Sequence, residues 1–128
     1  MYIELNNQKY NINHTEYLEL YDINGLFPDQ LCMLKKLRVL KIRGRRLIGS
    51  ISPKIKNLKQ LTHLDLSNNQ LQGDLPDSIC DLNKIWYINL TNNLLAGNMS
   101  ESILEFVAKR KLPLSNIVNG NNFNLNSC

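Results

Sequence analysis

The stretch LTHLDLSNNQLQGDLPDSICDL, residues 61–82, decides the fold of this chain. The same spacing of apolar residues and glycine recurs before it, beginning at Leu37, and after it, beginning at Ile85. In the central copy these positions are Leu61, Leu64, Leu66, Leu71, Gly73, Leu75, Ile79 and Leu82. A constant period of about 24 residues indicates stacked coils that share one elongated core, so the chain is predicted to be a solenoid.

The opening of each copy, L-x-x-L-x-L, predicts a short β-strand. Its final alternation places successive side chains on opposite faces. In the central copy, Leu64 and Leu66 should point into the core. His63, Asp65 and Ser67 should then point outward.

Two asparagines, Asn69 and Asn93, follow the strands at equivalent places. A buried side-chain amide can satisfy backbone groups that a tight bend leaves unpaired, so we expect both residues to be structural. Gly73 permits the next turn, and Pro76 ends that part of the coil. A short helical or extended segment should then return to the core.

The central copy resembles the plant-type leucine-rich repeat, L-x-x-L-x-L-S-x-N-x-L-x-G-x-I-P, and the likeness extends over about residues 15–105. The resemblance implies an α/β fold: a right-handed solenoid with a concave parallel β-sheet and short 3₁₀ or strand segments on the convex side. The resemblance also implies that the protein recognises other molecules, because family members are chiefly receptor ectodomains, inhibitors of secreted enzymes and scaffolds. We expect one domain over residues 1–128, made of a degenerate cap and repeat (1–36), three repeats (37–60, 61–84 and 85–108) and a C-terminal cap (109–128).

Three residues depart from the repeat pattern. Glu16 occupies a slot in which an apolar residue is expected. Arg45 stands where the structural asparagine should be, and Ser52 stands where proline should be. The cysteine-paired terminal caps of secreted family members are also absent, which weakens the inference of an extracellular role.

The segment SESILEFVAKRK, residues 100–111, predicts a helix that caps the C-terminal end of the core. Ser102 and Glu105 have the spacing of a capping box, and the apolar residues form a stripe at helical intervals. A helix that binds a membrane or a partner is the alternative. The tail from Leu112, which contains Phe123, should add a last irregular strand.

The cysteines do not predict a disulfide or a metal site. Cys32 and Cys80 occupy the same slot two coils apart, roughly 10 Å, beyond the ~7 Å between Cα atoms that a disulfide can bridge. Both are expected to be free thiols, and the terminal Cys128 is expected to have no partner within the chain. Because C-x-x-C spacings are missing, we expect neither a zinc ion nor any other cofactor.

The first residues, MYIELNNQKYNINH, lack the basic and then apolar order of a secretory signal, and no run of about 18 apolar residues occurs. The sequence therefore predicts a cytoplasmic protein, with secretion as the alternative if Met1 is not the native start. Sequons at Asn13, Asn89 and Asn98 matter only on a secretory route. A glycan on Asn89 would obstruct the strand face.

His63, Asp65 and Ser67 share one strand face and invite comparison with a hydrolase triad. However, alternate residues lie about 6.6 Å apart along a strand. Asp65 rather than His63 is central, so no Ser to His to Asp chain is evident. We expect no catalytic residues and no enzymatic activity.

The outward strand positions predict a surface that binds another protein, through Arg38, Lys41, Arg43, His63, Asp65, Trp86, Tyr87 and Asn89. Exposed aromatic residues beside arginine are typical of binding hot spots. The alternative is that Trp86 and Tyr87 only pack against neighbouring rows. Five strands would give a face about 24 Å wide and on the order of 400 Å², half of the ~800 Å² per partner of a standard interface. Binding should then be weak or multivalent, or include flanking loops.

Charge is uneven along the chain. Between Asp29 and Asp65 no acidic residue occurs, whereas ten basic residues do: Lys35, Lys36, Arg38, Lys41, Arg43, Arg45, Arg46, Lys54, Lys56 and Lys59. Since the whole chain carries +4, the remainder carries −6. This band favours an acidic protein partner, and it leaves nucleic acid or phosphoinositide binding, or simple solubility, as alternatives. Family resemblance alone adds a secreted enzyme inhibitor or receptor-like module; the oligomeric state is not predicted.

Overall fold

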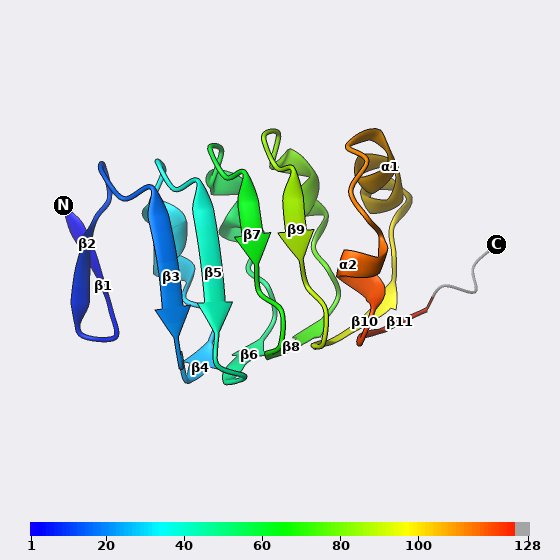
Figure 1. The fold of residues 1–128 in the computed structure, drawn as a ribbon, viewed down its shortest axis with the longest axis horizontal. Helices are drawn as coiled ribbons and strands as arrows, with labels where there is room; N and C mark the ends of the chain where they lie inside the picture. The colour runs from blue at the N-terminus through cyan, green and yellow to red at the C-terminus, as the bar shows by residue number, and fades with distance from the viewer. Residues whose placement is uncertain (125–128) are drawn as a thin grey trace.

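The structure, a computed structural model, describes residues 1–124 as a right-handed solenoid whose coils stack along its long axis (Figure 1). The concave sheet contains four parallel strands, β3 (Tyr17–Tyr21), β5 (Val39–Arg43), β7 (His63–Asp65) and β9 (Tyr87–Asn89). A second parallel sheet has the order β11-β10-β8-β6-β4, with β4 at Gly25–Leu26, β6 at Leu47–Gly49, β8 at Gln70–Gly73, β10 at Leu94–Asn98 and β11 at Asn122–Asn124. The predicted fold class is confirmed.

The period of the sequence appears directly in the strand register. Val39 pairs with His63 across β5 and β7, and His63 pairs with Tyr87 across β7 and β9. Three 3₁₀ helices complete the coils behind the concave sheet: η1 (Asp29–Met33), η2 (Pro53–Asn57) and η3 (Asp77–Asp81). Ser52, which replaces the expected proline, caps η2 because its Oγ accepts a hydrogen bond from the Lys54 amide.

The first coil is shorter than the others. Leu18 pairs with Leu40 across β3 and β5, whereas Leu40 pairs with Leu64 across β5 and β7, so the first offset is two positions shorter than the next. The prediction that Glu16 fills an apolar slot is therefore wrong. Leu18 and Leu20 fill the two core slots, while Glu16 precedes the strand and its carbonyl accepts hydrogen bonds from the amides that open β5.

One continuous core runs from Ile3 in the first strand to Ile117 near the C-terminal end. Leu64 and Leu66 are fully buried in it, as predicted. Every internal coil contributes leucine or isoleucine at equivalent places, and burial of each such side chain contributes about 1.5 to 3 kcal/mol of transfer free energy.

Asparagine side chains join successive coils. Asn69 Oδ1 accepts from the Leu47 amide at 3.3 Å, and Asn93 Oδ1 accepts from the Leu71 amide at 3.0 Å. Their Nδ2 atoms donate to buried strand carbonyls, so the predicted structural role of both residues is confirmed.

We call the series of buried asparagines that begins with Asn69 and Asn93 the asparagine ladder. Asn121 extends this ladder into the C-terminal segment. Its Oδ1 accepts from the Leu95 amide at 3.1 Å, and its Nδ2 donates to the carbonyl oxygen of Leu90 at 2.8 Å. The separation of Asn93 and Asn121 exceeds one regular coil by four positions, which is why the period did not reveal Asn121.

A β-hairpin closes the N-terminal end of the core, at the left of Figure 1. Strands β1 (Tyr2–Leu5) and β2 (Gln8–Asn11) are antiparallel and are joined by Asn6 and Asn7, whose φ angles are 49° and 63°. Asparagine tolerates the positive φ that a two-residue hairpin turn of this kind requires. This region is the predicted N-terminal cap, and its hairpin was not predicted from the sequence.

Helix α1 (Glu101–Lys109) covers the C-terminal end of the core, as predicted. Its N-cap is Ser100, whose Oγ accepts from the Ile103 amide at 3.1 Å, so the prediction of a cap at Ser102 is wrong by two residues. The short helix α2 (Ser115–Val118) follows, and then β11 adds the predicted last strand beside β10.

Cys32 and Cys80 are free thiols, as predicted, and desolvation raises the pKa of the Cys32 thiol to about 11. The prediction for Cys128 lies outside the described residues. Within residues 1–124, no His, Cys, Asp and Glu side chains gather in a group of three that could hold a metal ion. None of the helices in that range has the length and apolar character needed to cross a membrane.

Candidate interaction surface

The outward side chains of the concave sheet form parallel rows. Strand pairing aligns Tyr17, Val39, His63 and Tyr87 in one row and Glu19, Lys41, Asp65 and Asn89 in the next. Six of the eight predicted contact residues lie in the sheet: Lys41, Arg43, His63, Asp65, Tyr87 and Asn89. Arg38 and Trp86 each immediately precede a strand, so they lie at the edge where the coils enter the sheet.

An aromatic cluster joins this edge to the sheet. The His63 ring stacks on the Tyr87 ring, with centroids 4.2 Å apart and an interplanar angle of 17°. Trp86 meets His63 edge-on at 5.5 Å and remains 65% exposed. Burial, and then the nearby Lys41, lower the pKa of His63, so the ring is predominantly neutral at pH 7 and adds to an uncharged platform.

A hydrogen-bonded cluster around Glu19 lies on the same face of the sheet, at its N-terminal edge on β3 and β5. The Tyr17 hydroxyl donates to Glu19 Oε1 at 2.7 Å, and the Tyr21 hydroxyl donates to Oε2 at 2.6 Å. Arg43 Nε also donates to Oε2 at 3.0 Å. These donors, Tyr21 first, lower the pKa of Glu19 to about 2.

Tyr17, Glu19 and Tyr21 lie on the outward face, although they are absent from the predicted contact residues. The period of the regular coils does not apply to the first coil, which is two residues shorter. Applying that period assigns each residue of β3 to a position two places away from the one that it occupies. The strict alternation of YLELY, residues 17–21, is the sequence signal that identifies these side chains as outward-facing.

We expect the double substitution Tyr17→Phe with Tyr21→Phe to raise the pKa of Glu19 from about 2 toward its ordinary value of 4.5, because two donors to the carboxylate are lost. In the wild type, the lowered pKa of Glu19 means that its carboxylate stabilises the folded state. This stabilisation is complete above pH 4.5 and is lost as the pH falls through about 2. An NMR titration of the Glu19 carboxyl carbon measures the shift. Tyr2→Phe, in the exposed hairpin, is the control, and an unchanged midpoint in the double variant would contradict the assignment.

Asp65 and Asn89 are engaged in turns at the ends of their strands. Asp65 Oδ1 accepts from the Ser67 amide at 3.0 Å and from the Ser67 hydroxyl at 2.6 Å. Asn89 Oδ1 makes the same two bonds with Thr91, at 3.0 and 2.8 Å. Since the Ser67 hydroxyl donates to Asp65 while His63 stacks on Tyr87, this arrangement stabilises a turn and does not form a hydrolase relay.

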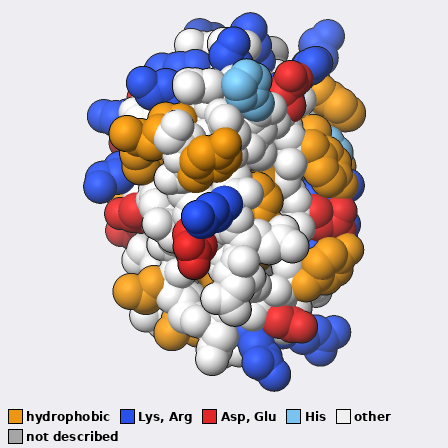
Figure 2. Space-filling model, turned by 90° about the vertical axis from the view of Figure 1, so that its left-hand side faces the viewer, with side chains coloured by type: hydrophobic (Ala, Val, Ile, Leu, Met, Phe, Trp, Pro, Cys, Tyr) orange, Lys and Arg blue, Asp and Glu red, His pale blue; other side chains and the backbone are white. Residues whose placement is uncertain are grey.

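The basic band divides among several surfaces. Lys41 and Arg43 lie in the concave sheet, and Lys54 and Lys56 lie on η2. Lys35, Lys36, Arg38 and Lys59 gather at the edge where coils enter the concave sheet, and Lys84 joins them there. In Figure 2, which faces the N-terminal end, Lys and Arg side chains (blue) gather along this upper edge.

The concave sheet is narrower than predicted. It contains four strands among the described residues rather than five, because the fifth coil passes through α2 beside β9 instead of forming a strand. Its width is therefore about 19 Å. A stable partner must contact flanking surfaces as well.

Comparison with known proteins identifies similar repeats. The Leucine rich repeat family model matches residues 35–95. Among curated proteins, none matches the chain.

Several solved structures from Arabidopsis thaliana are similar to this chain. A chain of the BIR3–SERK2 complex is 29% identical over 88% of this chain, with a TM-score of 0.75. The ectodomain of the receptor kinase SOBIR1 is 28% identical over 83% of this chain, with a TM-score of 0.69. The HAESA ectodomain, in complex with an extended IDA peptide hormone, is 36% identical over 69% of this chain, with a TM-score of 0.61. The chain spans only 58%, 56% and 14% of these three proteins, respectively.

Proposed function

Since this chain is a leucine-rich-repeat protein with plant-type repeats, we propose that it is a non-catalytic recognition module that binds another protein through its concave sheet. The similar structures support a role in recognition, because one is a complex between two proteins and another holds a peptide hormone. The identity of the partner is not transferred from them.

The single observation that carries the proposal is the aromatic cluster of His63, Trp86 and Tyr87, in which Trp86 is exposed and the other two rings are half-buried. Stacking on His63 fixes the Tyr87 ring, while Trp86 leaves most of its surface in solvent. Rigid aromatic side chains bury a large area at low entropic cost, and Trp, Tyr and Arg dominate binding hot spots. Lys41, which is near enough to lower the pKa of His63, supplies the charged neighbour.

The comparisons favour the secreted alternative over the predicted cytoplasmic location, because SOBIR1 and HAESA are represented by ectodomains. We therefore extend the proposal to a receptor-like or inhibitor-like module on the secretory route. Asn13 and Asn98 are exposed and accessible to glycosylation, whereas Asn89 is half-buried within the proposed binding face.

The test begins with affinity capture of a partner from extracellular fluid and from whole-cell extract, followed by mass spectrometry. We expect Trp86→Ala with Tyr87→Ala to weaken the captured partner's affinity about thirtyfold, corresponding to roughly 2 kcal/mol of hot-spot energy. Isothermal titration calorimetry measures the dissociation constant.

The matched control is Leu26→Ala with Leu94→Ala, which removes two exposed apolar side chains from the second sheet. This control should bind as the wild type does. Unchanged affinity of the aromatic variant, or an equal loss in the control, would count against the concave sheet as the binding surface.

A further inference from the structure

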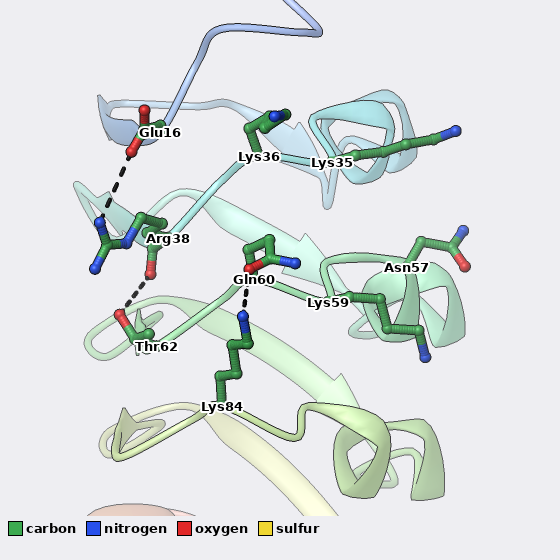
Figure 3. Close-up of a pocket in the computed structure, with 9 residues that line it drawn as sticks. All are labelled: Glu16, Lys35, Lys36, Arg38, Asn57, Lys59, Gln60, Thr62 and Lys84. Carbon is green, nitrogen blue, oxygen red and sulfur yellow. Dashed lines mark hydrogen bonds and ion pairs between the residues drawn. The ribbon is translucent and has the colours of Figure 1, made fainter.

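A second surface lies outside the concave sheet, at the edge where the coils enter it. Two hollows of about 710 Å³ each lie next to each other along this edge and share Lys84. Figure 3 shows the first, formed by the loops that lead from the 3₁₀ helices to β5, β7 and β9. We call the two hollows together the entry-edge groove.

The first hollow is strongly basic. Five cationic side chains line it, Lys35, Lys36, Arg38, Lys59 and Lys84, and Glu16 is its only acidic lining residue among those described. A concave surface lined by charge of one sign concentrates the electric field and attracts an oppositely charged ligand.

Over residues 1–124, three of the four lysines of this hollow are without an ionic or hydrogen-bonding side-chain partner. Arg38 lies 3.9 Å from Glu16, and Lys84 Nζ donates to Gln60 Oε1 at 2.6 Å. Lys35, Lys36 and Lys59 have no carboxylate within ion-pair distance in the part of the chain that the structure describes, and all three are exposed.

The positive charges follow the repeat. Lys35 and Lys59 form one row in neighbouring coils, and Lys36, Gln60 and Lys84 form a second, adjacent row across three coils. Neighbouring coils are about 4.8 Å apart, so the longer row extends roughly 10 Å along the solenoid. Three or four residues of an extended peptide cover that length, at about 3.3 Å per residue.

The second hollow is apolar on one side. Ile85, Trp86 and Phe106 line it, and Arg110 lies over the Phe106 ring at 5.2 Å. Arg110 also donates to the backbone carbonyls of Asn83 and Ile85, so it is already engaged within the fold.

From these contacts, we propose that the entry-edge groove binds an extended acidic segment of a partner protein, with carboxylates along Lys35, Lys59 and Lys84 and an apolar side chain against Trp86 and Phe106. A peptide supplies both kinds of group, whereas a homopolymeric polyanion supplies only charge. Nucleic acid fits less well, because the cationic hollow itself has no aromatic residue on which bases could stack and Arg110 is engaged within the fold. The proposal rests on the proposed function in that the ligand belongs to a protein.

The test measures fluorescence anisotropy of a labelled peptide that contains four glutamates followed by leucine and phenylalanine. The complete chain should bind it, and Lys35→Gln with Lys59→Gln should weaken binding at least tenfold. The matched control, Lys54→Gln with Lys56→Gln, removes the same charge from η2, in the same coil as Lys59 but outside the lining of the groove, and should change affinity less than twofold. Replacing the leucine and phenylalanine of the peptide by alanine should also weaken binding.

The proposal is overturned if the peptide does not bind, if both lysine pairs reduce binding equally, or if the apolar end of the peptide makes no difference. It is also overturned if oligothymidylate or phosphatidylserine vesicles bind more tightly than the peptide through the same lysines. The captured partner separates the two surfaces, because Tyr87 belongs only to the concave sheet and Lys35 and Lys59 belong only to the groove, whereas Trp86 belongs to both. Loss of binding with Tyr87→Ala alone but not with the Lys35 and Lys59 substitutions supports the concave sheet and overturns the groove. Loss with the two lysine substitutions but not with Tyr87→Ala supports the groove and overturns the concave sheet.

Discussion

Asn93→Ala is expected to lower the free energy of unfolding by about 2 to 4 kcal/mol, because it leaves a buried amide without an acceptor and creates a small cavity. Asn93 is only 4% exposed, and its Oδ1 accepts from the Leu71 amide. The carbonyls to which its Nδ2 donates have second partners, since Leu66 also accepts from Asn69 and Leu90 also accepts from Asn121. The loss is therefore concentrated on the Leu71 amide.

Urea denaturation followed by circular dichroism measures this effect. Asn57→Ala removes an exposed asparagine at the end of η2 and should change stability by less than about 0.5 kcal/mol. Equal stability of the two variants would show that the asparagine ladder does not hold the coils together.

Leu64→Ala should destabilise the protein by about 3 to 4 kcal/mol, since it removes a fully buried side chain from the middle of the core. The two flanking coils are fixed by their own strand pairings, so they cannot collapse far into the cavity. Thermal and urea unfolding give the change in stability.

The control for Leu64 is Leu26→Ala, at a leucine that is 70% exposed in the second sheet. It loses the same atoms without opening a core cavity and should remain within about 0.5 kcal/mol of the wild type. A Leu64 variant as stable as the Leu26 variant would be inconsistent with a shared elongated core.

The regular coils could be predicted from sequence because the apolar residues that recur with the period are the residues that form the core. Leu64 and Leu66 mark β7 through their alternation, and Asn69 and Asn93 recur where the bends need amides. The first coil could not be read in the same way. A fixed offset does not detect a strand that arrives two residues early, so Glu16 was placed in the core while Leu18 already occupied that slot.

Both ends of the chain depend on tertiary contacts that periodicity does not encode. Ser100 and Ser102 are equally suitable caps by residue type, and the helix begins after Ser100 because β10 ends at Asn98. Asn121 belongs to the ladder although the chain between it and Asn93 contains two helices instead of one regular coil.

The outward-facing side chains of the concave sheet were predicted in outline, since strand alternation determines which residues share a face. The contacts between rows were not predicted, because the rotamers of neighbouring coils determine them. The Glu19 cluster requires Tyr17, Tyr21 and Arg43 to converge on one carboxylate. Lys84 was also missed, because a charge run in the sequence ends at Lys59, whereas the groove continues into the next coil.

The asparagine ladder allows repeats to be added to such a solenoid during evolution. Asn69 and Asn93 bond within their own coil and to the coil before it, and not to the ends of the chain. A tandem duplication of the DNA that encodes residues 61–84 therefore supplies a strand, a ladder amide and a core segment together. The proposed recognition surface lengthens by one strand in a single genetic event, while the hairpin and the final helix keep their own neighbours.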